Sequence, residues 1–232
     1  MPGKLSKPLK FALLVALFIG PALVFYLMIY GGYHKVKRLR FYGPHTWETY
    51  VIKGKTKIDT LYFTLPKFFG FDYLNHTYNS DSLEGKTYIA QILDGALFDS
   101  VPKEVVFSAC ELMDSYPNLF LLTIFIEKFP AKFKFPSRVT RRLEDDSIRW
   151  HFISVPRSYT DLIIKNGFFA TSKDSLEFDP ASFVLIDRDG HIRGYYNPIL
   201  LQDIQNMKKE VVHLFREYEL EFKAHKLVRF NH

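Results

Sequence analysis

The chain has 232 residues, of which 47% are hydrophobic and 24% charged, a composition that excludes intrinsic disorder and is typical of one globular domain. Its net charge is +6, but removing seven basic residues that flank one apolar stretch would leave −1. The basic character therefore belongs to these flanks, and we expect no nucleic-acid-binding surface. The seven residues are Lys4, Lys7, Lys10, Lys35, Lys37, Arg38 and Arg40.

The apolar stretch is an uncharged run of 23 residues from Phe11 to Tyr33. As a helix rising about 1.5 Å per residue it would span about 34 Å, enough to cross a hydrocarbon core of roughly 30 Å. Tyrosines gather toward its C-terminal end, as aromatic residues do at a membrane interface. We therefore predict one transmembrane helix over 11–33, because the run is long for a cleaved signal peptide. The basic residues on its two sides are too evenly matched to give its orientation.

Short strands are predicted first after the apolar stretch. Residues 34–55 are typical of a linker and include a Gly-Pro turn region, Phe41–Trp47. Aromatic-rich runs at Thr60–Thr64 and Phe68–Tyr73 predict two short strands. A Leu-Glu-Gly-Lys turn then leads into a strand over Thr87–Leu93.

The central part of the chain alternates between helix and strand patterns. Helical spacing predicts a helix over Val101–Ser115, and Leu119–Ile126 is nearly unbroken in apolar residues, as expected of a central strand covered on both faces. A weak helical segment around Val139–Leu143 and a strand over Trp150–Val155 follow. The apolar face of the first helix comprises Val106, Ala109, Cys110 and Met113.

A short helix is predicted over Ser158–Asn166, with Ser158 as its N-cap and Gly167 as its stop. Two apolar runs, Phe183–Asp187 and His191–Tyr196, flank an Arg-Asp-Gly sequence, which predicts a β-hairpin. A long helix begins near residue 198, and we expect a basic C-terminal tail over 223–232. The apolar face of that helix comprises Ile204, Met207, Val211, Leu214 and Tyr218.

The order of these elements predicts an α/β, thioredoxin-like fold over residues 56–222. Strands separated by helices imply parallel pairing, and the late hairpin adds antiparallel strands at one edge. We therefore expect a central mixed sheet flanked by helices, preceded by one N-terminal transmembrane helix.

Four groups of residues occur along the chain in an order that is typical of one protein family. They are Gly85–Ala90 before a loop, Pro102-Lys103 at the start of the following helix, Trp150–Phe152 with Tyr159 and Asp161-Leu162, and Phe183–Asp187 with Gly190 and Ile192–Tyr196. Together with the apolar stretch and Phe41–Pro44, they resemble the Sco/SenC family, thioredoxin-like copper chaperones of cytochrome oxidase assembly. The last group is the closest match, and the resemblance covers most of the chain.

In that family a Cys-x-x-x-Cys loop and a distal histidine bind copper, because soft sulfur holds Cu(I) and imidazole suits either copper state. The resemblance places Leu97 and Val101 at the two cysteine positions and Asp179 at the histidine position. The leucine and valine side chains offer no lone pair. The resemblance thus implies a degenerate member of the family, and we expect no metal site and no cofactor.

Other residues offer little chemistry in their place. Cys110 is the single cysteine, so the chain has no intramolecular disulfide and no Cys-x-x-Cys redox pair. It lies more than two helical turns beyond Val101 on an apolar helix face, as expected of a small core residue. The eight histidines show no metal-ligand spacing, and Asp145-Asp146 is typical of a solvated loop. We expect no catalytic residue and no enzymatic activity.

The resemblance also implies a location and a role. It implies a single-pass protein of the bacterial inner membrane, with a cytoplasmic N-terminus over 1–10 and the globular domain on the periplasmic side. The implied partners are the lipid bilayer and a respiratory, cytochrome oxidase-type membrane complex, which the protein would bind as an assembly factor or accessory subunit. Two alternatives remain: a copper chaperone that uses non-standard ligands, and a thiol oxidoreductase that acts through Cys110.

The degenerate ligand positions generate a first prediction. We expect the domain from about Phe41 onward to bind neither Cu(I) nor Cu(II) tightly, because neither Leu97 nor Val101 has a donor atom in its side chain. Titration of the purified domain with copper in the presence of a competing chelator measures this. One stoichiometric copper that resists the chelator would contradict the prediction.

Overall fold

The computed structural model describes residues 8, 17, 19–26, 38–52, 55–94, 103–127, 129, 149–169, 183–197 and 200–230. The chain divides into two compact units, Met1–Lys37 and Arg38–His232. In the first unit residues 19–26 are helical, and most of the predicted transmembrane segment lies outside the described residues. Among the helices that the structure describes, none is both long and apolar enough to cross a membrane.

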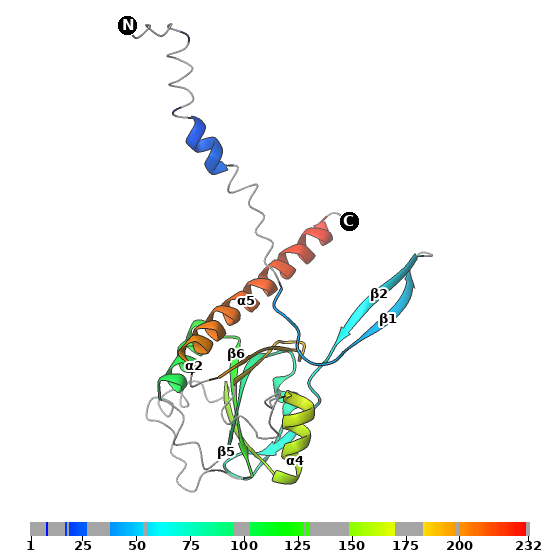
Figure 1. Cartoon of the computed structure of the whole chain (residues 1–232), viewed down its shortest axis with the longest axis vertical. Helices are drawn as coiled ribbons and strands as arrows, with labels where there is room; N and C mark the ends of the chain where they lie inside the picture. The colour runs from blue at the N-terminus through cyan, green and yellow to red at the C-terminus, as the bar shows by residue number, and fades with distance from the viewer. Residues whose placement is uncertain are drawn as a thin grey trace. The chain divides into compact units, whose positions relative to one another are not determined.

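The second unit is built on a seven-stranded mixed sheet in the order β4-β3-β7-β6-β5-β8-β9 (Figure 1). The pairs β5–β6 and β6–β7 are parallel, whereas β5–β8, β8–β9, β3–β7 and β3–β4 are antiparallel. The strands are β3 (Phe69–Phe71), β4 (Thr77–Asn79), β5 (Thr87–Asp94), β6 (Leu119–Ile126), β7 (Trp150–Val155), β8 (Phe183–Ile186) and β9 (Ile192–Tyr196).

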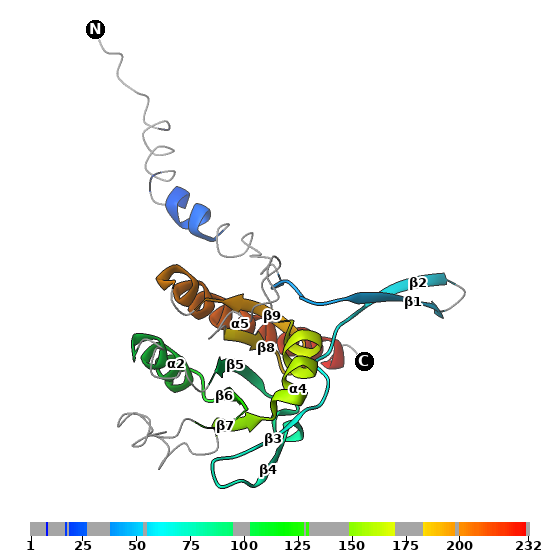
Figure 2. The same ribbon diagram turned by 60° about the horizontal axis from the view of Figure 1, so that its bottom comes forward.

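Helices cover both faces of this sheet (Figure 2). On one face α2 (Lys103–Ser115) and α5 (Leu201–Phe230) pack on a core that includes Met113 and Met207. On the other face α4 (Arg157–Asp161) runs into a π-helical segment, η3 (Leu162–Phe168), above a second core. The central strand β6 contributes to both cores, which explains its nearly unbroken apolar sequence.

Strand order and directions define a thioredoxin-like α/β fold with a mixed sheet, so this part of the predicted fold class is confirmed, whereas the N-terminal transmembrane helix stays a prediction. Parallel β5 and β6 are joined through α2, as a crossover connection requires. The late antiparallel pair β8–β9 lies at the edge of the sheet beside β5. The predicted strands at Thr87–Leu93, Leu119–Ile126 and Trp150–Val155 are all present.

Two helix boundaries differ from the prediction. The N-cap of α4 is Pro156 and makes no side-chain capping hydrogen bond, so Ser158 lies inside the helix rather than at its cap. Gly167 does not stop the helix, because the π-helical segment continues to Phe168. The weak helix around Val139–Leu143 lies outside the described residues.

The C-terminal helix begins and ends later than predicted. It starts at Leu201, and its helical backbone continues through the expected tail to Phe230. Ile204, Met207, Val211 and Leu214 of the predicted apolar face are buried. Glutamate, lysine and arginine are good helix formers, so a polar composition does not by itself end a helix.

A two-stranded antiparallel sheet stands apart from the main one in both views (Figures 1 and 2). It is a hairpin of β1 (His45–Ile52) and β2 (Lys55–Tyr62). The expected linker over 34–55 therefore contains a strand, and the compact unit begins at Arg38 rather than at residue 56. At the base of the hairpin the Phe41 and Tyr62 rings stack, with their centroids 4.0 Å apart.

Gly194 generates a prediction about stability. A Cβ atom at this position would lie 2.6 Å from Cζ of the Tyr196 ring, whose hydroxyl donates to the Glu210 carboxylate. Gly194→Ala would displace the buried ring and break that hydrogen bond, so we expect a loss of about 1–3 kcal/mol in the free energy of unfolding. Urea denaturation of the folded chain measures it.

Gly167→Ala is the matched control. A Cβ atom there would meet its nearest neighbour, Leu65, at 3.7 Å, which is ordinary van der Waals contact. We expect the free energy of unfolding to rise by less than about 1 kcal/mol, because alanine lowers the conformational entropy of the unfolded chain. Equal destabilisation by the two substitutions would contradict the steric role of Gly194.

Candidate functional site: a buried ionic network beside the β8–β9 turn

The positions predicted from the resemblance fall in two classes. Leu97, Val101 and Asp179 lie outside the described residues. Cys110 lies in the second half of α2 and is 6% exposed, in the core that α2 and α5 share. The prediction that Cys110 is buried is therefore confirmed. A thiol in this position is out of reach of a protein substrate.

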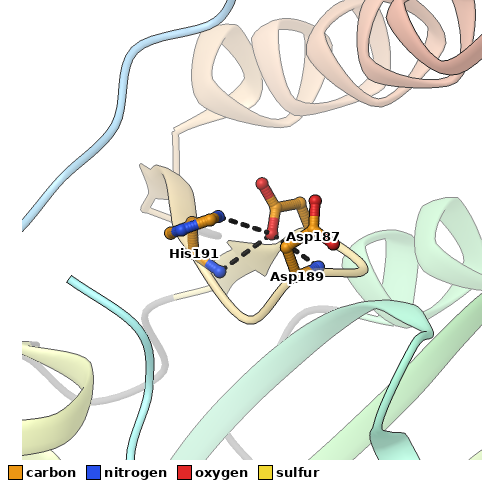
Figure 3. A group of neighbouring side chains, drawn as sticks. All are labelled: Asp187, Asp189 and His191. Carbon is orange, nitrogen blue, oxygen red and sulfur yellow. Dashed lines mark hydrogen bonds and ion pairs between the residues drawn. The ribbon is translucent and has the colours of Figure 1, made fainter. Parts of the chain in front are cut away.

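The turn between β8 and β9 is organised by a buried carboxylate (Figure 3). Asp187 is 2% exposed, and its Oδ1 accepts hydrogen bonds from the backbone N–H groups of Asp189 (3.0 Å) and His191 (2.8 Å). Gly190 supplies the left-handed backbone conformation of the turn, with φ of 82°. Of the Asp-Gly pair that predicted the hairpin, Gly190 permits the turn, whereas the carboxylate that holds it belongs to Asp187, two residues before Asp189.

The other oxygen of Asp187 accepts a hydrogen bond from Arg193 on β9, at 3.0 Å. Arg193 is 4% exposed, and it also donates to the Glu217 carboxylate on α5 at 2.9 Å. It also donates hydrogen bonds to the backbone carbonyl oxygens of Leu39 (3.0 Å) and Arg40 (3.2 Å). We call Asp187, Arg193 and Glu217 the Arg193 network.

The Arg193 network also holds the segment that precedes the β1–β2 hairpin. The Arg193 guanidinium lies over the Phe41 ring, 4.2 Å from its centroid, in a cation–π contact. Glu217 accepts a hydrogen bond from the backbone N–H of Leu39. The His191 ring meets Phe41 edge-on, at 5.2 Å between centroids. Residues 39–41 are therefore fixed to both the β8–β9 hairpin and α5.

Less buried charges surround this network. Glu221 on α5 forms ion pairs with Arg38 and Arg188, both at 3.0 Å. The Tyr218 hydroxyl accepts a hydrogen bond from the backbone N–H of Arg188. Burial raises the pKa of Tyr218 to about 12, so that hydroxyl stays protonated at neutral pH.

One group of side chains is compact enough to hold a metal ion. The ligand atoms of Asp187, Asp189 and His191 lie within 4.8 Å of one another. The donor set does not fit Cu(I), since two carboxylates and one imidazole lack the soft sulfur that this ion prefers. Asp187 already accepts two backbone N–H groups and the positively charged Arg193 guanidinium, which opposes a bound cation. We conclude that this group stabilises the turn.

The sequence analysis did not identify the Arg193 network. Its signal was present, because Asp187 directly follows the buried strand β8 and Arg193 lies within the mostly buried strand β9. Buried charges are paired in folded proteins, so each such residue predicts a partner of opposite charge. The spacing along the chain does not say which partner it is.

The fold places the chain among the thioredoxin-like α/β proteins, and this assignment rests on the strand order and directions. No protein-family model matches the chain, and no curated protein matches it. Similar solved structures include a SCO1/SenC family lipoprotein from Bacillus anthracis str. Ames, with 13% identity over 65% of this chain and 94% of that chain and a TM-score of 0.47.

Two further structures illustrate the range of the matches. BsSco, a member of the Sco family of cytochrome c oxidase assembly proteins, has 15% identity over 66% of this chain and 93% of that chain, with a TM-score of 0.47. A thiol peroxidase from Chromobacterium violaceum has 19% identity over 68% of this chain and 87% of that chain, with a TM-score of 0.44. Matches at this level do not choose between a chaperone and an enzyme.

The Arg193 network generates a third prediction. Arg193→Leu would leave the carboxylates of Asp187 and Glu217 buried without their shared cation, so we expect a loss of about 3–5 kcal/mol in the free energy of unfolding. Urea denaturation measures it. The control is Arg188→Leu, whose side chain is 42% exposed and whose loss should be below about 1 kcal/mol. Similar losses of unfolding free energy in both variants would show that the buried ion pairs of Arg193 stabilise the fold no more than the exposed ion pair of Arg188.

Proposed function

We propose that this chain is a membrane-anchored protein whose thioredoxin-like domain acts by binding another protein, without copper and without enzymatic chemistry. The observation that carries the proposal is the burial of Cys110, the only thiol in the chain. Thiol chemistry needs an accessible thiolate, and disulfide exchange within one chain also needs a second cysteine.

The position of Cys110 within its helix supports the same conclusion. Reactive cysteines gain thiolate character at helix N-termini, where the helix dipole stabilises negative charge. Cys110 lies well inside α2, which begins at Lys103, and faces the core with Ala109 and Met113. An apolar environment disfavours the thiolate, so the residue is suited to packing.

Copper chemistry lacks suitable donors at the positions given by the resemblance. Leucine at 97 and valine at 101 cannot coordinate a metal, and aspartate at 179 is a hard oxygen ligand. Among the described residues, Asp187, Asp189 and His191 form a group that could hold a metal ion. The Asp187 carboxylate, however, already accepts a hydrogen bond from Arg193. Protein binding is then the function that a Sco-like domain of this sequence retains.

The role follows from the anchor and from the resemblance. A helix over 11–33 would hold the domain at the bacterial inner membrane, on the periplasmic side, and raise its effective concentration near membrane partners. The Arg193 network fixes residues 39–41, directly after the basic cluster that follows the apolar run, onto the domain. We propose an assembly factor or accessory subunit of a respiratory, cytochrome oxidase-type membrane complex.

The fourth prediction tests this role by exchanging the anchor in the full chain. Replacement of residues 11–33 by an unrelated apolar span of equal length should preserve membrane fractionation and most partner recovery. A cleavable signal peptide in its place should release the domain and reduce the recovery of partner proteins about tenfold or more. The reason is that confinement to the membrane raises the apparent affinity for a membrane partner by about tenfold or more. A pull-down in mild detergent with mass spectrometry measures the recovery.

Cys110→Ala is the control for thiol chemistry. It should leave partner recovery unchanged at a stability loss of about 1 kcal/mol or somewhat more, since it removes a small buried side chain. Undiminished recovery of the same partners by the released, soluble domain would refute the membrane-subunit proposal. Loss of recovery in a fully folded Cys110→Ala variant would instead favour the thiol oxidoreductase.

A further inference from the structure

The β1–β2 hairpin presents two faces of different chemistry. Directly paired residues share a face, and successive residues along each strand alternate between faces. One face, which we call the uncharged face, has no Lys, Arg, Asp or Glu at any of its eight positions. It consists of His45, Trp47, Thr49, Val51, Thr56, Ile58, Thr60 and Tyr62. The other face carries Glu48, Lys55, Lys57 and Asp59.

The uncharged face is nevertheless open to solvent in the described part of the chain. Ile58 is 71% exposed, Val51 is 68% exposed and Trp47 is 67% exposed. A two-stranded ribbon is marginally stable in water unless something packs on it. Segregation of all four charges to the opposite face, together with these exposed apolar side chains, is typical of an interaction surface.

The cross-strand pairs give this surface a regular relief. Three of the four pairs join a larger side chain with a smaller one: Tyr62 with His45, Trp47 with Thr60, and Ile58 with Thr49, whereas Val51 and Thr56 are similar in size. The larger member alternates between the two strands from one pair to the next. A zigzag ridge of large side chains therefore runs along the ribbon, and a zigzag groove of smaller ones lies beside it.

This relief is complementary to itself. A two-fold axis parallel to the strands, between two facing ribbons, would place β1 of one copy over β2 of the other with the pairs at the same level. Trp47 would then face Thr60 of the second copy, and Ile58 would face Thr49. Every larger side chain meets a smaller one, as interdigitating sheets require. We propose that the uncharged face binds the uncharged face of a second copy of this chain in a symmetric dimer.

The size of the surface agrees with a dimer that forms between confined copies. Eight residues at about 3.4 Å each and two strands about 4.8 Å apart give roughly 270 Å² per copy, below the ~800 Å² of a standard interface. The two-fold axis along the strands keeps the two hairpins parallel, with the starts of both β1 strands at the same end of the dimer. This confinement step rests on the proposed anchor.

Other occupants fit the surface less well. An element that binds lipid by one apolar face usually carries an excess of lysine or arginine on its other face, whereas here Lys55 and Lys57 are balanced by Glu48 and Asp59. A different protein would not require the face to be complementary to itself. The alternation of large and small side chains in three successive pairs is therefore best explained by a second copy.

Crosslinking of single-cysteine variants of the full chain, in membranes from expressing cells, tests the proposal. In a Cys110→Ala background, Thr49→Cys places a thiol on the uncharged face and Thr46→Cys places one on the opposite face of the same strand. Facing sheets lie about 10 Å apart, so a bis-maleimide that spans about 10 Å is used instead of direct oxidation. We expect homodimers from Thr49→Cys at a yield about tenfold above Thr46→Cys, since the dimer requires the uncharged faces to meet.

A second pair of variants tests the chemistry of the surface. Ile58→Lys, combined with Thr49→Cys, should lower the dimer yield about tenfold, because each copy would bury an unpaired ammonium group against position 49 of the other. Asp59→Lys, on the opposite face, should leave the yield unchanged. Thr56→Cys repeats the main measurement on β2, in case Thr49→Cys disturbs folding.

Three outcomes would overturn the proposal. They are equal yields from Thr49→Cys and Thr46→Cys, crosslinks from Thr49→Cys only to a different protein, and protection of Thr49→Cys from maleimide by phospholipid vesicles without any homodimer. Fractionation of the same samples reports on the anchor separately. A chain that leaves the membrane fraction yet forms the dimer refutes the proposed anchor, whereas an anchored chain without the dimer refutes only this inference.

Discussion

The buried guanidinium of Arg193 connects more of this structure than any other side chain discussed above. It joins the end of β8 through Asp187, α5 through Glu217, and the segment before β1 through the carbonyls of Leu39 and Arg40. Removing three charged groups from water is unfavourable, and a buried ion pair is weak evidence for high stability. Its clearer effect is on specificity, because these segments can satisfy their charges and carbonyl groups only in this one arrangement. The direction in which the β1–β2 hairpin leaves the domain depends on that arrangement.

The Arg193 network lies between two regions of different character, the core that contains Cys110 and the exposed β1–β2 hairpin. In the described residues, the thioredoxin-like sheet encloses its single thiol between α2 and α5, where Cys110 contributes packing. The hairpin, in contrast, exposes Trp47, Val51 and Ile58 on a face without charge. Phe41 lies between the two regions, under the Arg193 guanidinium and against the Tyr62 ring. The domain thus buries its thiol and exposes apolar side chains on the hairpin, which is the arrangement that the proposed association requires.

The hairpin also shows where sequence patterns fail. Its first strand was expected to be part of a linker, because of the Gly-Pro turn region Phe41–Trp47, and its second strand only as a short run at Thr60–Thr64. Alternation of apolar and polar residues identifies strands that have one face in a core, and β1 and β2 have none in this chain. The pairing of His45 with Tyr62 fixes the register of the whole ribbon, and that register decides which side chains share a face. The helix caps failed for a related reason, since packing against the sheet outweighs the local preference of Ser158 or Gly167.

The sequence by itself determined the elements whose burial is set by local periodicity. The unbroken apolar run Leu119–Ile126 could only be a central strand, and the helical spacing around Cys110 predicted that its side chain lies in the core. The Asp-Gly turn predicted the β8–β9 hairpin, and the order of these elements was sufficient for the thioredoxin-like class. Only the tertiary structure decided that Arg193 pairs with Glu217, 24 residues away, and with the carbonyl of Leu39, 154 residues away. Such contacts depend on how the helices and strands pack against one another. A local sequence pattern predicts that a buried charge has a partner, but not which distant charge or carbonyl group it is.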